Sequence, residues 1–150
     1  MNLLLDTNIL IYLIKDPSSQ LLENVINPNK ENILVSVISI GELKSIALQN
    51  NWGVRKLQTV ETVLDKVSIV EVSESLINTY AEIDAFSQRR NPSYTDYPFS
   101  TPRNMGKNDL WIASTAALLG LKVVTTDADF NHLHQIFIEV QTVKPDLFRS

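Results

Sequence analysis

Short, nearly continuous apolar runs alternate along the chain with segments whose apolar residues recur at helical spacing. Runs without polar alternation are typical of parallel strands that are covered on both faces. They occupy residues 3–5, 33–37, 67–72, 121–124 and 136–140. Helical spacing marks residues 9–14, 21–26, 40–48, 54–64, 76–86 and 110–119, and Gly120 is a natural stop after the last of these helices. The alternation predicts an α/β sandwich around a mostly parallel sheet.

One segment, residues 91–107 (NPSYTDYPFSTPRNMGK), interrupts this alternation with three prolines and no period. Such a long connection in a compact domain is typically functional or mobile. Aromatic residues lie inside it, and the basic residues around it are Arg89, Arg90, Arg103 and Lys107. Two interpretations stay open. One is an ordinary surface loop beside a solvated helix end, and the other is a substrate-facing flap with cations for phosphates and rings for bases.

The composition is that of an ordinary globular protein. The chain has 150 residues, 44% of them hydrophobic and 20% charged, which predicts one domain over residues 1–150. No apolar run is long enough to cross a bilayer, and no basic residue precedes the apolar start MNLLLDTNIL, so neither a membrane span nor a secretory signal is expected. The absence of cysteine excludes thiolate chemistry and suits a reducing, cytoplasmic location. Because the net charge is -4, any binding to nucleic acid has to come from local cations.

Two of the predicted strands end in an acid beside a hydroxyl residue. Asp6 follows the first apolar run, and Thr125, Thr126 and Asp127 follow the fourth. Open parallel sheets place ligand sites at the carboxyl ends of their strands, where the strand order reverses. If these two strands are neighbours, Asp6 and Asp127 lie close together.

Two further acids lie near predicted helix starts. Glu42 is expected in the first turn of a helix, and Asp109 follows Asn108, a candidate N-cap. Each acid alone also has a structural explanation, since Glu42 completes a capping box with Ser39 and Asp109 offsets a helix dipole. The remaining acids are candidate helix caps in the same way: Asp6, Asp127 and Asp129.

Taken together, acids at strand ends and helix starts would line one end of an α/β sheet. Four carboxylates crowded there repel one another and resist ionisation, and a divalent cation removes that cost. Oxygen ligands without cysteine select hard ions, so the expected cofactor is Mg²⁺ or Mn²⁺. The two histidines, His132 and His134, are expected to be surface or packing residues.

The segments LLLDTNILIYL, SVISIGEL and KNDLWIASTAALLGLKVVTTDADF resemble the PIN-domain ribonucleases, and most closely the VapC-type toxins of bacterial toxin–antitoxin pairs. The likeness runs from the first strand to Phe130. It implies a three-layer α/β/α sandwich with a five-stranded parallel sheet in the order 3-2-1-4-5. It maps the family's catalytic and metal-binding acids onto Asp6, Glu42, Asp109 and Asp127, with Asp129 as a further metal ligand. Supporting positions map onto Thr7, Asn8, Thr125 and Thr126.

The resemblance also implies a function. The chain would be a Mg²⁺- or Mn²⁺-dependent endoribonuclease that hydrolyses RNA by in-line attack of water and leaves a 5′-phosphate. It would be the toxin of a type II toxin–antitoxin pair, with a small antitoxin protein as partner and a homodimer as its assembly. The candidate RNA-phosphate contacts are Arg89, Arg90, Arg103 and Lys107.

Other functions stay open. A degenerate PIN domain that acts as a non-catalytic binding module, and a housekeeping RNA-processing nuclease, would share the same pattern. A haloacid-dehalogenase-like phosphatase is disfavoured, because its chemistry needs an acid two residues after the nucleophilic aspartate, where this chain has Asn8. A nucleotide-binding Rossmann domain is disfavoured because the four glycines are scattered.

Overall fold

Five parallel strands form one sheet in the order β3-β2-β1-β4-β5. The computed structural model describes residues 1–16 and 19–144 of the chain. Its strands are β1 (Leu3–Leu5), β2 (Ile33–Ser36), β3 (Ser68–Val70), β4 (Lys122–Thr125) and β5 (Glu139–Thr142). The strand order reverses between β1 and β4, the place where open α/β sheets bind their ligands. The predicted fold class and strand order are confirmed.

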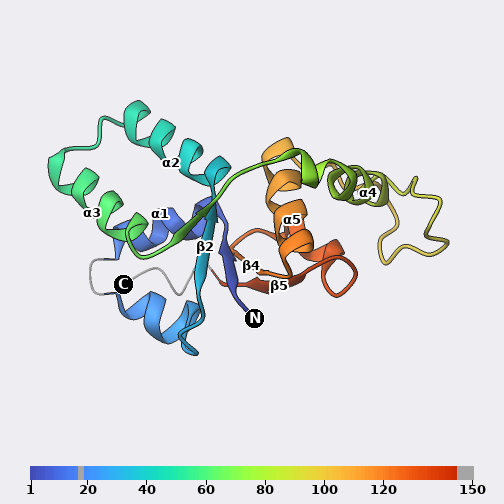
Figure 1. Ribbon diagram of the computed structural model, residues 1–150, viewed down its shortest axis with the longest axis horizontal. Helices are drawn as coiled ribbons and strands as arrows, with labels where there is room; N and C mark the ends of the chain where they lie inside the picture. Colours follow the sequence, from blue (N-terminus) through green and yellow to red (C-terminus); the bar gives the residue numbers. More distant parts are fainter. Residues whose placement is uncertain (17–18, 145–150) are drawn as a thin grey trace.

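Helices cover both faces of the sheet (Figure 1). On one side lie α1 (Thr7–Lys15), α2 (Val37–Gln49) and α3 (Val54–Leu64), and on the other lie α4 (Ile77–Ser87) and α5 (Lys107–Leu119). Shorter helical turns are η1 (Leu22–Ile26, a π-helical turn) and the 3₁₀ turns η2 (Glu74–Leu76) and η3 (Ala128–Leu133). The chain is therefore the expected three-layer sandwich.

Strand β1 explains why the apolar runs are continuous. Leu3, Leu4 and Leu5 are all buried. Leu3 and Leu5 belong to the core beneath α1, α2 and α3, whereas Leu4 belongs to the core beneath α4 and α5. Successive side chains of a strand point to opposite faces of the sheet. Because helices cover both faces, every position of the strand has to be apolar.

The bounds of four strands differ from the sequence prediction. β3 covers residues 68–70 rather than 67–72, and β4 covers residues 122–125 rather than 121–124. β2 ends one residue early, because the Ser36 side chain accepts a backbone hydrogen bond and caps α2. β5 begins at Glu139 rather than at residue 136, because the chain first makes a turn in which Gln135 N–H donates to the Ile138 carbonyl at 2.7 Å. An apolar run therefore does not fix where a strand begins, since Ile136 in this turn is 40% exposed whereas Ile138 is buried.

The last helix ends as the sequence predicts. Gly120 has φ 67° and ψ 41°, a left-handed conformation that glycine adopts without a steric cost. In the two described ranges, no helix combines the length and the apolar character that crossing a membrane requires.

Candidate active site

Asp6 lies at the carboxyl end of β1 and is only 4% exposed. Its Oδ1 accepts a hydrogen bond from the Thr7 backbone N–H at 2.8 Å, so Asp6 caps α1, as one of the structural explanations predicts. Its other oxygen, Oδ2, accepts a hydrogen bond at 2.8 Å from the Thr125 hydroxyl at the end of β4. A helix cap requires only the first of these contacts. The second ties the Asp6 carboxylate to the neighbouring strand.

Strand β4 brings Asp127 to the same edge of the sheet. β1 and β4 are paired in register, so the residues that follow them lie side by side, as predicted. The Thr125 hydroxyl links the two acids, because it donates to Asp6 and accepts from the Asp127 N–H at 3.0 Å. Asn8 Nδ2 donates to Asp127 Oδ2 at 3.4 Å. The Asp127 side chain makes no capping hydrogen bond to η3, so the cap explanation is wrong for this residue.

Glu42 reaches the same edge from α2. The helix begins at Val37, so Glu42 lies in its second turn, and both the predicted first-turn position and the capping box with Ser39 are wrong. Glu42 Oε1 instead accepts a hydrogen bond from Thr7 Oγ1 at 2.8 Å. Because Thr7 also donates its backbone N–H to Asp6, one residue links the two carboxylates. Ser39 is fully buried, and its hydroxyl has no partner among the described residues.

Asp109 lies in the first turn of α5. The helix begins at Lys107 with Gly106 as its cap, so the predicted cap, Asn108, is wrong. Burial, together with the negative charges of four other acids, raises the pKa of Asp109 to about 7. In decreasing order of effect these are Asp6, Asp129, Asp127 and Glu42. Charges act on one another strongly only at short range, so all the predicted acids share one region.

The same crowding acts on the other acids. Burial raises the pKa of Asp6, hydrogen bonds from neighbouring threonine groups oppose this increase, and the charges of Asp127 and Glu42 add to it. Burial also raises the pKa of Asp127, with a further contribution from Asp129, an exposed residue in η3. These increases have the sign expected of carboxylates that are held close together.

The donor set suits a hard divalent cation. It offers carboxylate oxygens beside hydroxyl and amide groups, the ligand chemistry of Mg²⁺ and Mn²⁺. Within residues 1–16 and 19–144, no three acidic, histidine or cysteine side chains are drawn together closely enough to hold an ion. The Asp6, Glu42 and Asp127 carboxylates are turned towards hydroxyl and amide donors instead. A cation site therefore requires the side chains to move together, and the identity of its ligands stays a prediction.

The predicted phosphate-binding cations lie around the loop between α4 and α5. They are all exposed: Arg89, Arg90, Arg103 and Lys107. The rings of this loop pack inward, since the centroids of Tyr94, Tyr97 and Phe99 lie 4.8, 5.2 and 5.5 Å from that of Phe86. Phe99 is only 6% exposed. The interpretation in which the rings stack on bases is therefore wrong for Phe99, and the two tyrosines are engaged in the same cluster.

Among the described residues, neither histidine donates a hydrogen bond to a carboxylate of the predicted site. His132 is buried and shares a 2.8 Å hydrogen bond with the Ser87 hydroxyl, and burial, with the nearby Arg103 charge, lowers its pKa to about 4. His134 is exposed, and its Nδ1 accepts a hydrogen bond from the Val140 N–H at 2.9 Å. The expected packing and surface roles are confirmed.

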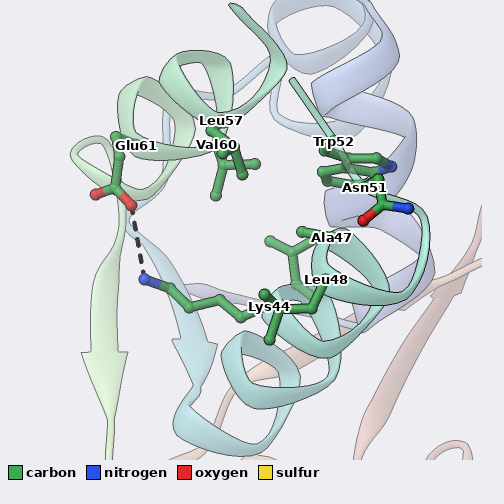
Figure 2. Close-up of a pocket in the computed structure, with 9 residues that line it drawn as sticks. Lys44, Ala47, Leu48, Asn51, Trp52, Leu57, Val60 and Glu61 are labelled. Carbon is green, nitrogen blue, oxygen red and sulfur yellow. Dashed lines mark ion pairs between the residues drawn. The ribbon is translucent and has the colours of Figure 1, made fainter. Parts of the chain in front are cut away.

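A separate pocket of about 460 Å³ lies between α2 and α3. Figure 2 shows Leu48, Leu57 and Val60 in the space between the two helices, and an ion pair in which Lys44 Nζ lies 3.6 Å from Glu61 Oε1. None of the predicted site acids lines this pocket. The periodicity of the two helices does not indicate it, because the space depends on how they pack.

Residues 3–135 match the PIN domain family, so the chain belongs to this family. Ribonuclease VapC1 of Haemophilus influenzae (strain R2866) is 27% identical over 124 residues, which are 81% of this chain and 84% of that protein. The structure of VapBC2 from Rickettsia felis bound to a promoter DNA fragment is similar with a TM-score of 0.74 at 21% identity, covering 96% of this chain and 100% of that one. The structure of VapBC-1 from nontypeable Haemophilus influenzae is similar with a TM-score of 0.71 at 24% identity, covering 95% of this chain and 98% of that one. The family that the sequence motifs resemble is confirmed.

Proposed function

We propose that this PIN-domain protein is a metal-dependent endoribonuclease and the toxin of a type II toxin–antitoxin pair. One observation carries the proposal: Asp6, Glu42 and Asp127 are joined through Thr7 and Thr125 at the edge of the sheet where the strand order reverses. The names of similar proteins, ribonuclease VapC1 and the VapBC structures, support an RNA substrate and an antitoxin partner.

The cofactor is Mg²⁺ or Mn²⁺, and the residues that would hold it are Asp6, Glu42, Asp109, Asp127 and Asp129. When bound, such a cation activates a water molecule and offsets negative charge at the scissile phosphate. Asp6 has the most fixed position, because it is buried and both of its oxygens accept hydrogen bonds. Cleavage by this chemistry should leave a 5′-phosphate on one of the two RNA fragments, as the family resemblance implies.

The supporting residues act on the acids themselves. Thr7 and Thr125 orient the carboxylates by donating hydroxyl or backbone hydrogen bonds, and Asn8 donates to Asp127. Outer hydrogen bonds of this kind set the direction and basicity of ligand groups. Thr126 is half-buried and directly follows the last residue of β4, and its supporting role rests on the family resemblance.

The proposal is tested by Asp6→Asn, which keeps the shape of the side chain and removes its charge. Purified wild-type protein should cleave cellular RNA in the presence of Mg²⁺ or Mn²⁺, and EDTA should abolish this cleavage. The Asp6→Asn variant should be inactive, and its circular dichroism spectrum should match that of wild type. Asp65→Asn is the matched control, because Asp65 is an exposed acid at the end of α3. Cleavage by Asp6→Asn, or by wild type in EDTA, would contradict the mechanism.

The cellular part of the proposal has its own test. Induction of the wild-type gene should arrest growth, induction of Asp6→Asn should not, and a small neighbouring reading frame should restore growth. Light scattering checks the proposed homodimer, and cell fractionation checks the cytoplasmic location. RNA binding without cleavage would favour the non-catalytic binding module, and cleavage without growth arrest would favour the RNA-processing nuclease.

A further inference from the structure

The loop between α4 and α5, residues 88–106, is a closed unit, called here the arm. Its two ends are held together, because Arg103 N–H donates to the Ser87 carbonyl at 2.7 Å and Gln88 Nε2 donates to Asn104 Oδ1 at 3.0 Å. In Figure 1 the arm is the yellow segment beyond α4, on the side away from α2 and α3. A connection of this length without secondary structure of its own is uncommon in a compact domain, and such loops are often functional.

The interior of the arm is packed and hydrogen-bonded. Tyr94, Tyr97 and Phe99 surround Phe86, the hub of the aromatic cluster. Asn91 is buried, and its backbone both donates to and accepts from the Tyr97 hydroxyl at 3.0 Å. An arm that is already ordered loses little conformational entropy when a ligand binds to it.

The surface of the arm is cationic, although the whole chain is acidic. It carries three arginines and a single acid, Asp96, in a chain of net charge -4. The Arg89 guanidinium carbon lies 5.3 Å from the centroid of the Tyr97 ring, and that of Arg103 lies 5.8 Å from the Phe99 ring. Among the residues that the structure describes, no carboxylate forms an ion pair with either arginine. Both charges are therefore held in position by rings while their donors remain exposed to solvent.

Arg89 is one of five non-glycine residues with a positive φ among those that the structure describes. Helix α4 ends in a Schellman motif, in which Arg90 N–H donates to the Ala85 carbonyl at 2.9 Å and Arg89 N–H donates to the Phe86 carbonyl at 3.0 Å. Arg89 takes the left-handed position of this motif, with φ 59°, where glycine is the usual residue. A side chain that is kept at a strained backbone position points to a use for that side chain.

The arm joins the acidic site at two places. It runs directly into α5, whose first turn carries Asp109. The Ser87 hydroxyl at its base lies 2.8 Å from His132 in η3, the turn that also carries Asp129. The charges of Arg103 and Asp129 both shift the pKa of His132, so the arginine lies within electrostatic range of the same ring as the acid.

We propose that the arm is a preorganised RNA-binding element in which Arg89 and Arg103 bind backbone phosphates of single-stranded RNA beside the scissile bond. Guanidinium groups match phosphate oxygens with two parallel hydrogen bonds, and a ring beneath each group limits its motion. Arg90 and Lys107 add to the local positive charge. The inference rests on the proposed ribonuclease function and names the surface on which its substrate lies.

The test combines Arg89→Gly with Arg103→Gln and measures binding of a fluorescein-labelled single-stranded RNA of mixed sequence. Binding is measured by anisotropy over a salt series, both in the Asp6→Asn background and with otherwise wild-type protein in EDTA. Loss of two exposed phosphate contacts should weaken binding roughly 5- to 30-fold. The slope of log K against log salt should become shallower by about 1.4, since each contact to a single strand contributes about 0.7. Arg55→Gln is the matched control, because Arg55 is an exposed arginine in α3.

Thermal unfolding separates this role from a structural one. Arg89→Gly should unfold at the same or a higher temperature than wild type, because glycine suits φ 59°. Unchanged affinity and salt slope in the double variant would overturn the proposal, and so would an equal loss in Arg55→Gln. A failed cleavage assay with intact arm-dependent binding would count against the ribonuclease function alone. Normal Asp6-dependent cleavage, together with RNA binding that the arm substitutions leave unchanged, would count only against the proposed role of the arm.

Discussion

Replacing Asp109 by asparagine should stabilise the protein at neutral and alkaline pH when divalent cations are removed with EDTA. Asp109 is half-buried at the start of α5, and the negative charges of the other site acids disfavour its ionised form. Asparagine keeps the shape of the side chain and removes the charge. The variant should therefore lose the unfavourable interactions that raise the pKa of this residue.

The magnitude follows from the pKa of Asp109, which is raised from 3.8 to about 7. Because the folded state binds this proton more tightly than the unfolded state, the free energy of unfolding falls as the pH rises from about 4 to about 7, and the loss is complete above pH 7. Three pKa units correspond to roughly 4 kcal/mol for a group removed from solvent. Asp109 is only partly buried, so solvent screening reduces the expected gain to about 1–2 kcal/mol, or about 3–6 °C in Tm.

Thermal unfolding followed by circular dichroism in EDTA measures this gain. Asp109→Asn should exceed wild type in Tm at about pH 8, and the difference should be smaller at about pH 5, where Asp109 in the folded wild type is still protonated and carries no charge. Added Mg²⁺ should raise the Tm of wild type more than that of the variant. The exposed-acid variant Asp65→Asn should show neither effect. An asparagine variant that is no more stable than wild type at pH 8, or a gain independent of pH, would refute the reasoning.

Two further substitutions test the hydrogen bonds of the site and the base of the arm. Thr125→Val leaves the Asp6 carboxylate and the Asp127 N–H without their shared hydroxyl, so the free energy of unfolding should fall by about 1–3 kcal/mol and kcat for RNA should fall more than KM rises. Equal kcat in Thr125→Val and in the exposed α3 control Thr62→Val would contradict this. Phe86→Ala removes the hub of the aromatic cluster, so the free energy of unfolding should fall by about 3–5 kcal/mol. Limited proteolysis of this variant should cut within residues 88–106. An unchanged proteolysis pattern would show that the arm does not depend on the hub.

The sequence by itself determined the layers of the fold and the position of the two site acids that follow strands, Asp6 and Asp127. The first strand has no polar residue that could face solvent, because it consists of Leu3, Leu4 and Leu5. This pattern requires helices on both faces of a parallel sheet. Asp6 and Asp127 follow directly after buried strands, so their place at the sheet edge depends only on the strands before them. The strand order came from a family resemblance and not from periodicity.

Only the tertiary structure decided which groups meet. Glu42 reads locally as a capping box, yet its partner is Thr7, 35 residues earlier in the chain. Phe99 reads as an exposed ring in a polar loop, yet it packs against Phe86. The pKa of Asp109 depends on charges that are distant in sequence. Local patterns report whether a residue is buried and how its backbone is arranged, whereas hydrogen bonds and charge interactions depend on the packing of elements that are far apart along the chain.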